Sequence, residues 1–148
     1  MLDAKRLRVQ PVNPTGIEVI WQKAVESAHD AEVPGLSIDG SLRSAYDAGH
    51  MAALALLAAH GLRTGSGPGH HEMAFAGAAA LGGQALVDLV PDSAEIREWR
   101  NGSMYDPVIA GPEERRHALE WMRRTLPAIR RALVAVDRSL DQRLRRFP

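Results

Sequence analysis

The stretch SLRSAYDAGHMAALALLAAHG, residues 41–61, predicts one long helix. Its small and apolar residues recur at spacings of three and four, which places them on one face of a helix. Asp39 and Ser41 are good N-caps near its start, and Gly61 is a natural C-cap after His60. The inner face consists of Leu42, Ala45, Tyr46, Gly49, Ala53, Leu56 and Leu57. We therefore expect a helix that buries one side against its neighbours.

The composition extends this expectation to the whole chain. Its 148 residues fit one domain with a core of its own. Hydrophobic residues make up 45% of the chain and aromatic residues only 5%, so alanine and leucine must fill most of the core. Close-packed helices suit this composition better than a sheet, which needs more β-branched and aromatic residues. We identify no convincing strand and no internal repeat.

Four further segments show helical signals. Thr15 and Glu18 predict a capping box that starts a helix ending near Ala31. A small-residue helix is expected from about His70 to Leu81, and another from the cap at residues 91–93 to about Met104. Pro112 suits the first turn of a last long helix, which Pro127 should bend. Its apolar seam is Leu119, Met122, Leu126, Ile129, Leu133, Val136 and Leu140.

The expected fold is therefore all-α, an antiparallel bundle of four to five helices. Residues 1–14, with two prolines, are expected to form an irregular lead-in, and residues 15–148 a single helical-bundle domain. The start of the chain has no long apolar run, so we expect neither a signal peptide nor a membrane anchor, and a cytoplasmic protein. The chain has no cysteine, which excludes disulfides and thiolate metal sites.

Charge is unevenly distributed although the net charge is zero. From residue 112 onward the chain has ten arginines against five acidic residues, and the earlier part has the opposite excess. Such separation can mark a surface for an acidic partner such as RNA. Arginine pairs at helical spacing are also typical of a solvated helix face, and we favour that interpretation.

A histidine-rich segment could suggest a metal site and a glycine-rich segment a phosphate site, but the spacing of their residues supports neither. GHHEMAF brings His70, His71 and Glu72 together, but the zinc-protease pattern has a second histidine where this chain has Phe75. Adjacent histidines also point about 100° apart on a helix. We therefore predict no metal and no cofactor there, and interpret these histidines as capping or surface residues. The loop RTGSGPG, residues 63–69, lacks the lysine and glycine spacing of phosphate-binding loops and is expected to be a flexible connection.

The stretch REWRNGSMYDP, residues 97–107, contains the best candidate binding residues. If the helix reaches Met104, then Arg97, Asn101 and Tyr105 lie four apart on one stripe, with Arg100 beside it. Arginine binds phosphate bidentately, asparagine can contact a base or a sugar hydroxyl, and tyrosine can stack on a base. The alternative is that both arginines bind the last carbonyls of the helix and that Asp106 pairs with one of them.

The sequence resembles the HEPN superfamily (higher eukaryotes and prokaryotes nucleotide-binding domain). The resemblance lies in SAYDAGHMAALALLAAHGLRTGSGPGHHEMAFAGAAAL, residues 44–81, followed by REWRNGSMYDP, and extends over about residues 17–133. It implies a bundle of four or five helices, commonly a homodimer whose paired motifs form one cleft. Many members are metal-independent ribonucleases and toxins that use an arginine followed by a polar residue and, after a short gap, a histidine.

Carried onto this chain, the resemblance places the catalytic positions at Arg100, Asn101 and Tyr105, with Tyr105 where the family has histidine. The next histidine along the chain is His117. Cleavage by a 2′-hydroxyl needs proton transfer near neutral pH, whereas an ordinary tyrosine titrates near about 10. We therefore expect a homodimer that binds RNA or a nucleotide through Arg97, Arg100, Asn101 and Tyr105, with weak or no catalysis.

Two alternatives remain open from the sequence. One is a metal-independent endoribonuclease, as in a toxin–antitoxin or defence system, in which Tyr105 replaces the motif histidine. The other is a protein-interaction module that pairs with a nucleotidyltransferase.

Overall fold

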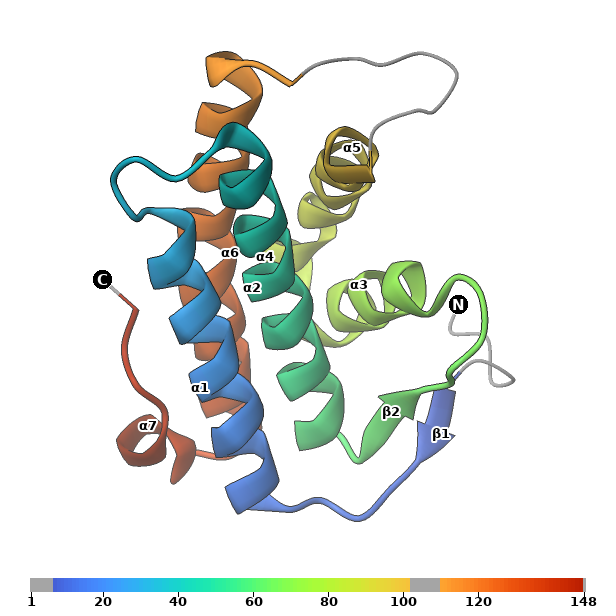
Figure 1. The fold of residues 1–148 in the computed structure, drawn as a ribbon. Helices are drawn as coiled ribbons and strands as arrows, with labels where there is room; N and C mark the ends of the chain where they lie inside the picture. Colours follow the sequence, from blue (N-terminus) through green and yellow to red (C-terminus); the bar gives the residue numbers. More distant parts are fainter. Residues whose placement is uncertain (1–6, 102–109, 148) are drawn as a thin grey trace.

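Helices make up most of the computed structural model, which describes residues 7–101 and 110–147 (Figure 1). The helices are α1 (Pro14–Ala31), α2 (Ile38–Ala59), α3 (His70–Gly82), α4 (Gln84–Val87), α5 (Leu89–Asn101), α6 (Pro112–Val136) and α7 (Leu140–Arg143). The prediction of an all-α bundle is confirmed. In the part of the chain that the structure describes, none of the helices combines the length and the apolar composition needed to cross a membrane.

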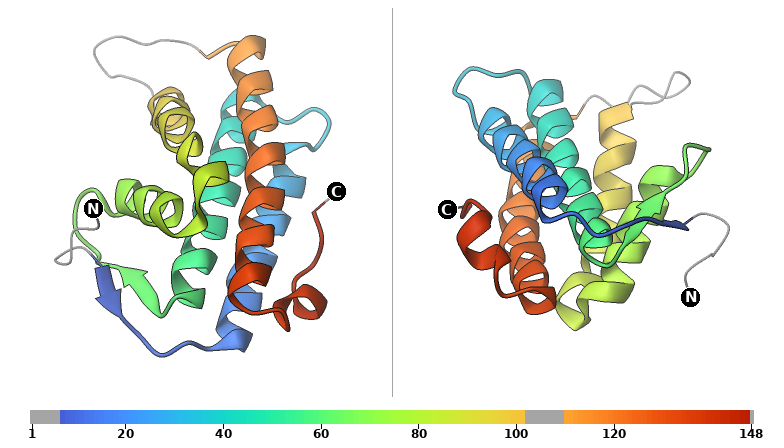
Figure 2. Two further views of the ribbon diagram at one scale, coloured as in Figure 1. Left: turned by 180° about the vertical axis from the view of Figure 1, so that it is seen from behind. Right: turned by 90° about the horizontal axis from the view of Figure 1, so that it is seen from below.

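Helix α2 lies at the centre of the bundle and contacts α1, α3, α5 and α6. Helix α1 runs antiparallel to α2 and α6, whereas α3 lies across α2 (Figures 1 and 2). The inner face predicted for α2 is buried throughout, from Leu42 to Leu57. A helix this rich in alanine can be surrounded on several sides because its neighbours approach its backbone closely.

The contact between α2 and α6 is closest at a glycine of α2, Gly49, which lies under Trp121 of α6. The indole of Trp121 in α6 is fully buried and lies directly over Gly49 in α2. A Cβ atom placed on Gly49 would lie 2.2 Å from Cη2 of that indole, well inside van der Waals contact. Gly49 is therefore the position at which the largest side chain of α6 enters the core.

A short antiparallel ribbon corrects two predictions made from the sequence. Strand β1 (Leu7–Val9) pairs with β2 (Leu62–Thr64), with Leu7 opposite Thr64. Residues 1–14 are therefore not irregular over β1, and the chain does contain strands. Each strand is three residues long, too short for an alternating pattern to show in the sequence. Gly61 enables the chain to leave α2 for β2, because its φ of 73° is in the left-handed region.

Three helices begin earlier than predicted. Helix α5 begins at Leu89, so the cap expected at residues 91–93 lies within the helix. The carboxamide oxygen of Asn13 accepts from the backbone N–H groups of Thr15 and Gly16, so α1 begins at Pro14 without the predicted capping box. The hydroxyl of Ser37 accepts from the backbone N–H of Gly40 at 3.0 Å and starts α2 slightly earlier than expected. In α1 and α2 the cap is thus a polar residue that precedes the predicted ones, Asn13 and Ser37 respectively.

The last long helix follows its predicted seam over most of its length. Met122, Leu126, Ile129 and Leu133 are buried in α6, but Val136 is exposed and ends the helix. Beyond it the chain turns back, so Leu140 reaches the core from α7 instead.

Hydrogen bonds fasten this C-terminal segment to the bundle. Arg130 donates to the carbonyls of Asp141 and Leu144, and Trp21 in α1 donates from Nε1 to the carbonyl of Arg145. The segment after α6 is therefore packed against both α1 and α6.

Candidate functional site

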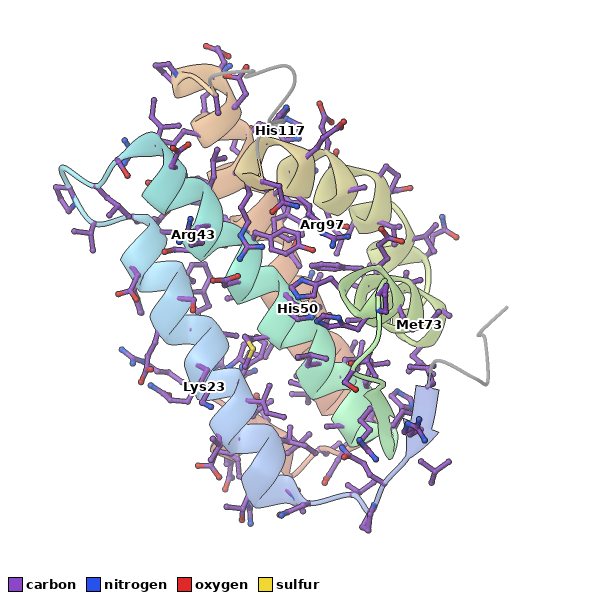
Figure 3. All side chains as sticks on the ribbon, turned by 45° about the vertical axis from the view of Figure 1, so that its right-hand side comes forward. Lys23, Arg43, His50, Met73, Arg97 and His117 are labelled. Atoms are coloured by element: carbon purple, nitrogen blue, oxygen red, sulfur yellow. The ribbon has the colours of Figure 1, made fainter. Side chains whose placement is uncertain are left out.

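The candidate residues of α5 lie where this helix approaches α2 and α3. Arg97, Arg100 and Asn101 belong to the last turns of α5, and Tyr105 lies outside the described residues. Arg97 and His50 extend into the same region between the three helices (Figure 3). The predicted stripe on α5 is therefore confirmed for Arg97 and Asn101, which are both helical and line one pocket.

Arg97 connects α5 to α3. Its Nη1 lies 3.0 Å from Oε1 of Glu72, in the first turn of α3. The guanidinium is about one-third exposed and the carboxylate about two-thirds, so solvent screens the pair and its net contribution to stability is small. Arg97 is thus held in position but remains accessible to a ligand.

Arg100 connects α5 to α2. Its Nη2 lies 3.5 Å from Oδ1 of Asp47, and its guanidinium carbon lies 5.2 Å from the ring centre of Tyr46. A guanidinium at this distance from an aromatic face is attracted by the ring quadrupole. The alternative prediction, that both arginines bind the last carbonyls of their own helix, is wrong for the described residues because each reaches across to a neighbouring helix. The pairing with Asp106 that it included lies outside the described residues.

Burial alters the titration of the two α2 residues beside Arg100. Desolvation raises the pKa of Tyr46 to about 12, although the positive charges of Arg97 and Arg100 act in the opposite direction. The pKa of Asp47 is also raised by burial, and the charges of Arg100 and Arg43 oppose that rise. The phenol of Tyr46 is therefore protonated at neutral pH and can only donate or accept a hydrogen bond.

The histidines of α2 and α3 form an aromatic stack that the sequence did not indicate. The rings of His50 and His71 are nearly parallel with centres 4.0 Å apart, and the ring of Tyr46 stacks on His71 at 5.8 Å. Only His70 fits the predicted role of a capping or surface residue, since its Nδ1 lies 3.1 Å from the carbonyl of Gly67. For His71, which lies in the stack on His50, that prediction is wrong.

Both imidazoles of the stack favour the neutral state. Burial, followed by the charges of His71 and His70, lowers the pKa of His50 to about 3. Burial is also the main reason why the pKa of His71 is lowered, with His70 and the two arginines of α5 adding to it. Parallel stacked rings do not direct two nitrogens at one point, so this pair is a poor metal ligand set.

The described residues contain one other group that could hold a metal ion. Donor atoms of Asp92, Glu95 and His117 lie within 4.8 Å of one another between α5 and α6. His117 Nε2 is 3.5 Å from Asp92 Oδ1, and Arg124 Nη2 is 3.6 Å from Asp92 Oδ2. The guanidinium of Arg124 already offsets the charge of Asp92, so the group is explained as a polar network between two helices.

A pocket of about 280 Å³ opens between α3 and α5. Phe75, Val90 and Ala94 form apolar walls, and Tyr46 of α2 lies at the contact of the three helices. The remaining lining residues are polar or charged: Glu72, Ser93, Arg97, Glu98 and Asn101. An apolar space with a few charged groups at its edge is the usual form of a small-ligand site.

The arginines of α6, by contrast, are mostly engaged in ion pairs. Arg116 pairs with Glu113, Arg123 with Glu32, Arg124 with Asp92 and Arg130 with Asp141. Most of these guanidinium groups are more than half exposed, as expected for a solvated helix face; Arg130 is the exception, at 13%. Three of these four pairs hold α6 to other parts of the chain, and the fourth, Arg116 with Glu113, lies within α6.

Comparison of this chain with protein-family models, curated proteins and solved structures gives no match. The resemblance to the HEPN superfamily therefore stays a prediction, as does a catalytic role for Arg100, Asn101 and Tyr105. The sequence did not indicate Asp47 or Glu98, and it suggested Tyr46 only as part of the inner face of α2. His71 and Glu72 were considered only as metal ligands, because they are adjacent in GHHEMAF.

Proposed function

We propose that this chain binds RNA or a nucleotide at the surface where α5 meets α2 and α3. Arg97, Arg100 and Asn101 supply the contacts, together with Tyr105 on the sequence argument. The observation that carries the proposal is that the partly exposed guanidinium of Arg97 lines a pocket of about 280 Å³, while that of Arg100 lies over Tyr46, which lines the same pocket. Charged donors beside an apolar space suit a ligand that combines phosphate with a planar base.

We further propose that cleavage is weak or absent. Proton transfer in RNA cleavage is most efficient when the catalytic group titrates near the working pH. Burial moves the stacked imidazoles away from that range, with a pKa of about 3 for His50. It also raises the pKa of Tyr46 to about 12. Groups with these pKa values are suited to binding and packing, and are poor proton shuttles at pH 7.

A matched pair of substitutions tests the binding site. Arg97 and Arg143 are both arginines that pair with a glutamate, Glu72 in α3 and Glu18 in α1 respectively. Fluorescence anisotropy with a labelled single-stranded RNA should show at least tenfold weaker binding for Arg97→Gln. Binding by Arg143→Gln, which removes the same charge from α7, should change by less than twofold. Equal losses from the two variants would mean diffuse attraction and no defined site.

A metal-independent ribonuclease remains a second candidate because of one observation. The imidazoles of His70 and His71 belong to the first turn of α3, and Glu72 of the same turn pairs with Arg97. Two imidazoles therefore lie near the arginines of α5, although the motif itself has none. Incubation of labelled RNA in excess chelator, followed by a denaturing gel, separates the two functions. Intact RNA at saturating protein supports binding alone. Cleavage that is lost in both Arg100→Ala and His71→Asn would establish the nuclease.

A further inference from the structure

The charges around the site are divided between two places. Asp47 of α2 lies within the field of two arginines, Arg100 and Arg43, so this side of the site carries a positive excess. The pocket edge carries Glu72 and Glu98 against the single charge of Arg97, an excess of negative charge. A phosphate is therefore favoured on the side of Arg100 and Arg43, whereas the pocket favours a neutral group that offers hydrogen-bond donors.

The pocket has room for one flat ring system. Its volume of about 280 Å³ lies at the lower end of small-ligand sites, which span about 300–1,000 Å³. Its walls come from Phe75, Val90 and Ala94, so a planar aromatic face can replace water there at little cost. A base can enter only if it is unpaired and unstacked, which restricts the ligand to single-stranded RNA or a free nucleotide.

The polar groups at the pocket edge distinguish among the bases. Glu72 accepts from Nη1 of Arg97, whose other N–H groups can still donate to a ligand. Glu98 is the other carboxylate that lines the pocket, and it can accept two parallel hydrogen bonds from a base. Guanine alone among the four RNA bases has two adjacent nitrogens, N1 and N2, that donate in parallel. Its O6 and N7 are acceptors for a guanidinium, the role open to Arg97. Uracil offers one donor flanked by two acceptors, which a carboxylate repels.

We infer that the pocket between α3 and α5 selects an unpaired guanine base. Glu98 accepts from guanine N1–H and N2–H, Arg97 donates to O6 and N7, and the adjoining phosphate lies toward Arg100 and Arg43. This inference rests on the proposed function, because it specifies the ligand of the same site.

The test uses heptanucleotides of uridine in which only the central base differs. Anisotropy should show that the guanine-containing RNA binds at least tenfold more tightly than those with adenine, cytosine or uracil at the centre. Glu98→Gln should remove most of this preference, because an amide offers one acceptor in place of two. Glu95→Gln, on the same helix but outside the pocket, should retain it.

The outcomes separate the two proposals. Equal binding of all four RNAs, or a preference for another base, overturns the guanine inference and leaves the proposed function standing. Absence of binding to every RNA and to free guanosine monophosphate overturns both. A guanine preference that persists in Glu98→Gln also overturns the inference, because recognition would then lie elsewhere.

Discussion

Gly49 is the residue at which the fold tolerates the least change. Alanine is the better helix former by about 1 kcal/mol, so an exposed glycine in a helix is usually improved by this substitution. At Gly49 the added methyl would lie 2.2 Å from Cη2 of Trp121, a rigid indole with no exposed surface. Relief requires movement of α6 relative to α2, because the ring itself has no free space.

We therefore expect Gly49→Ala to lower the free energy of unfolding by about 1–3 kcal/mol, the usual range for an overpacked core. Urea denaturation followed by circular dichroism measures the change. Gly67→Ala is the matched control, since no atom lies within 4 Å of its added methyl, and it should have almost no effect. A stabilised Gly49→Ala protein would contradict the packing of Trp121 described above.

Asp47 makes the role of Arg100 testable. If Arg100 binds phosphate, Asp47 competes for it, so Asp47→Asn should raise RNA affinity about two- to tenfold as a charge competitor is removed. Asp39→Asn removes the same charge from an exposed position at the start of α2 and should have a smaller effect. If Arg100 only fastens α5 to α2, Asp47→Asn lowers the melting temperature and leaves the affinity unchanged.

At the scale of elements, the contact between α2 and α3 makes folding sensitive to pH. The pKa of His50 is lowered by burial to about 3, and the groups that face it are His70 and His71 of α3 and Arg97 and Arg100 of α5. Between its unfolded pKa of about 6.5 and its folded value, the unfolded chain binds a proton that the folded chain does not. The free energy of unfolding therefore has its full contribution from neutral His50 above about pH 6.5, and this contribution decreases as the pH falls from 6.5 toward the folded pKa of about 3.

We expect the free energy of unfolding to decrease from pH 7.5 to pH 5, with a slope of up to about 1.4 kcal/mol per pH unit for each such proton. His50→Asn should flatten this slope in urea titrations at several pH values. His29→Asn, at an exposed position on α1, should leave it unchanged. The same slope in wild type and His50→Asn would show that other groups cause the acid sensitivity.

Sequence patterns predicted the helices better than their ends and missed the ribbon. The apolar spacing of α2 and most of α6 was sufficient, because one buried face repeats over many turns. Caps were less certain, since Asn13 and Thr15 are both suitable and only the backbone geometry selects Asn13. The pairing of β1 with β2 joins segments far apart in the chain, and three-residue strands leave no periodic signal.

At the scale of the whole molecule, the site combines residues of α5, which helical spacing predicted, with residues of α2 and α3, which only the packing of the helices brings there. The stripe on α5 follows from helical spacing, so Arg97 and Asn101 could be predicted. Their neighbours Tyr46 and Glu72 come from α2 and α3, and nothing in a single sequence shows that these helices meet there. His71 was likewise interpreted as a capping or surface residue, whereas it lies within the field of the two arginines of α5.

We also propose that the chain forms a two-fold symmetric dimer, as the family resemblance and the small-residue helix α3 suggest. Light scattering at high micromolar concentration should give twice the chain mass of 16.1 kDa. A protein that stays at the mass of one chain at that concentration would exclude a dimer as the basis of the site.

The salt dependence of RNA binding tests the central claim most directly. Each arginine–phosphate contact releases counterions, so the logarithm of affinity falls linearly with the logarithm of salt concentration. Thermal melting first verifies that Arg100→Gln is folded. We then predict that this variant binds RNA more weakly and that its slope of log affinity against log salt is smaller in magnitude by about 1, the value for one lost phosphate contact. Arg143→Gln should reproduce the wild-type slope. Equal slopes for wild type and Arg100→Gln, or the same reduction in both variants, would contradict a phosphate site at the end of α5.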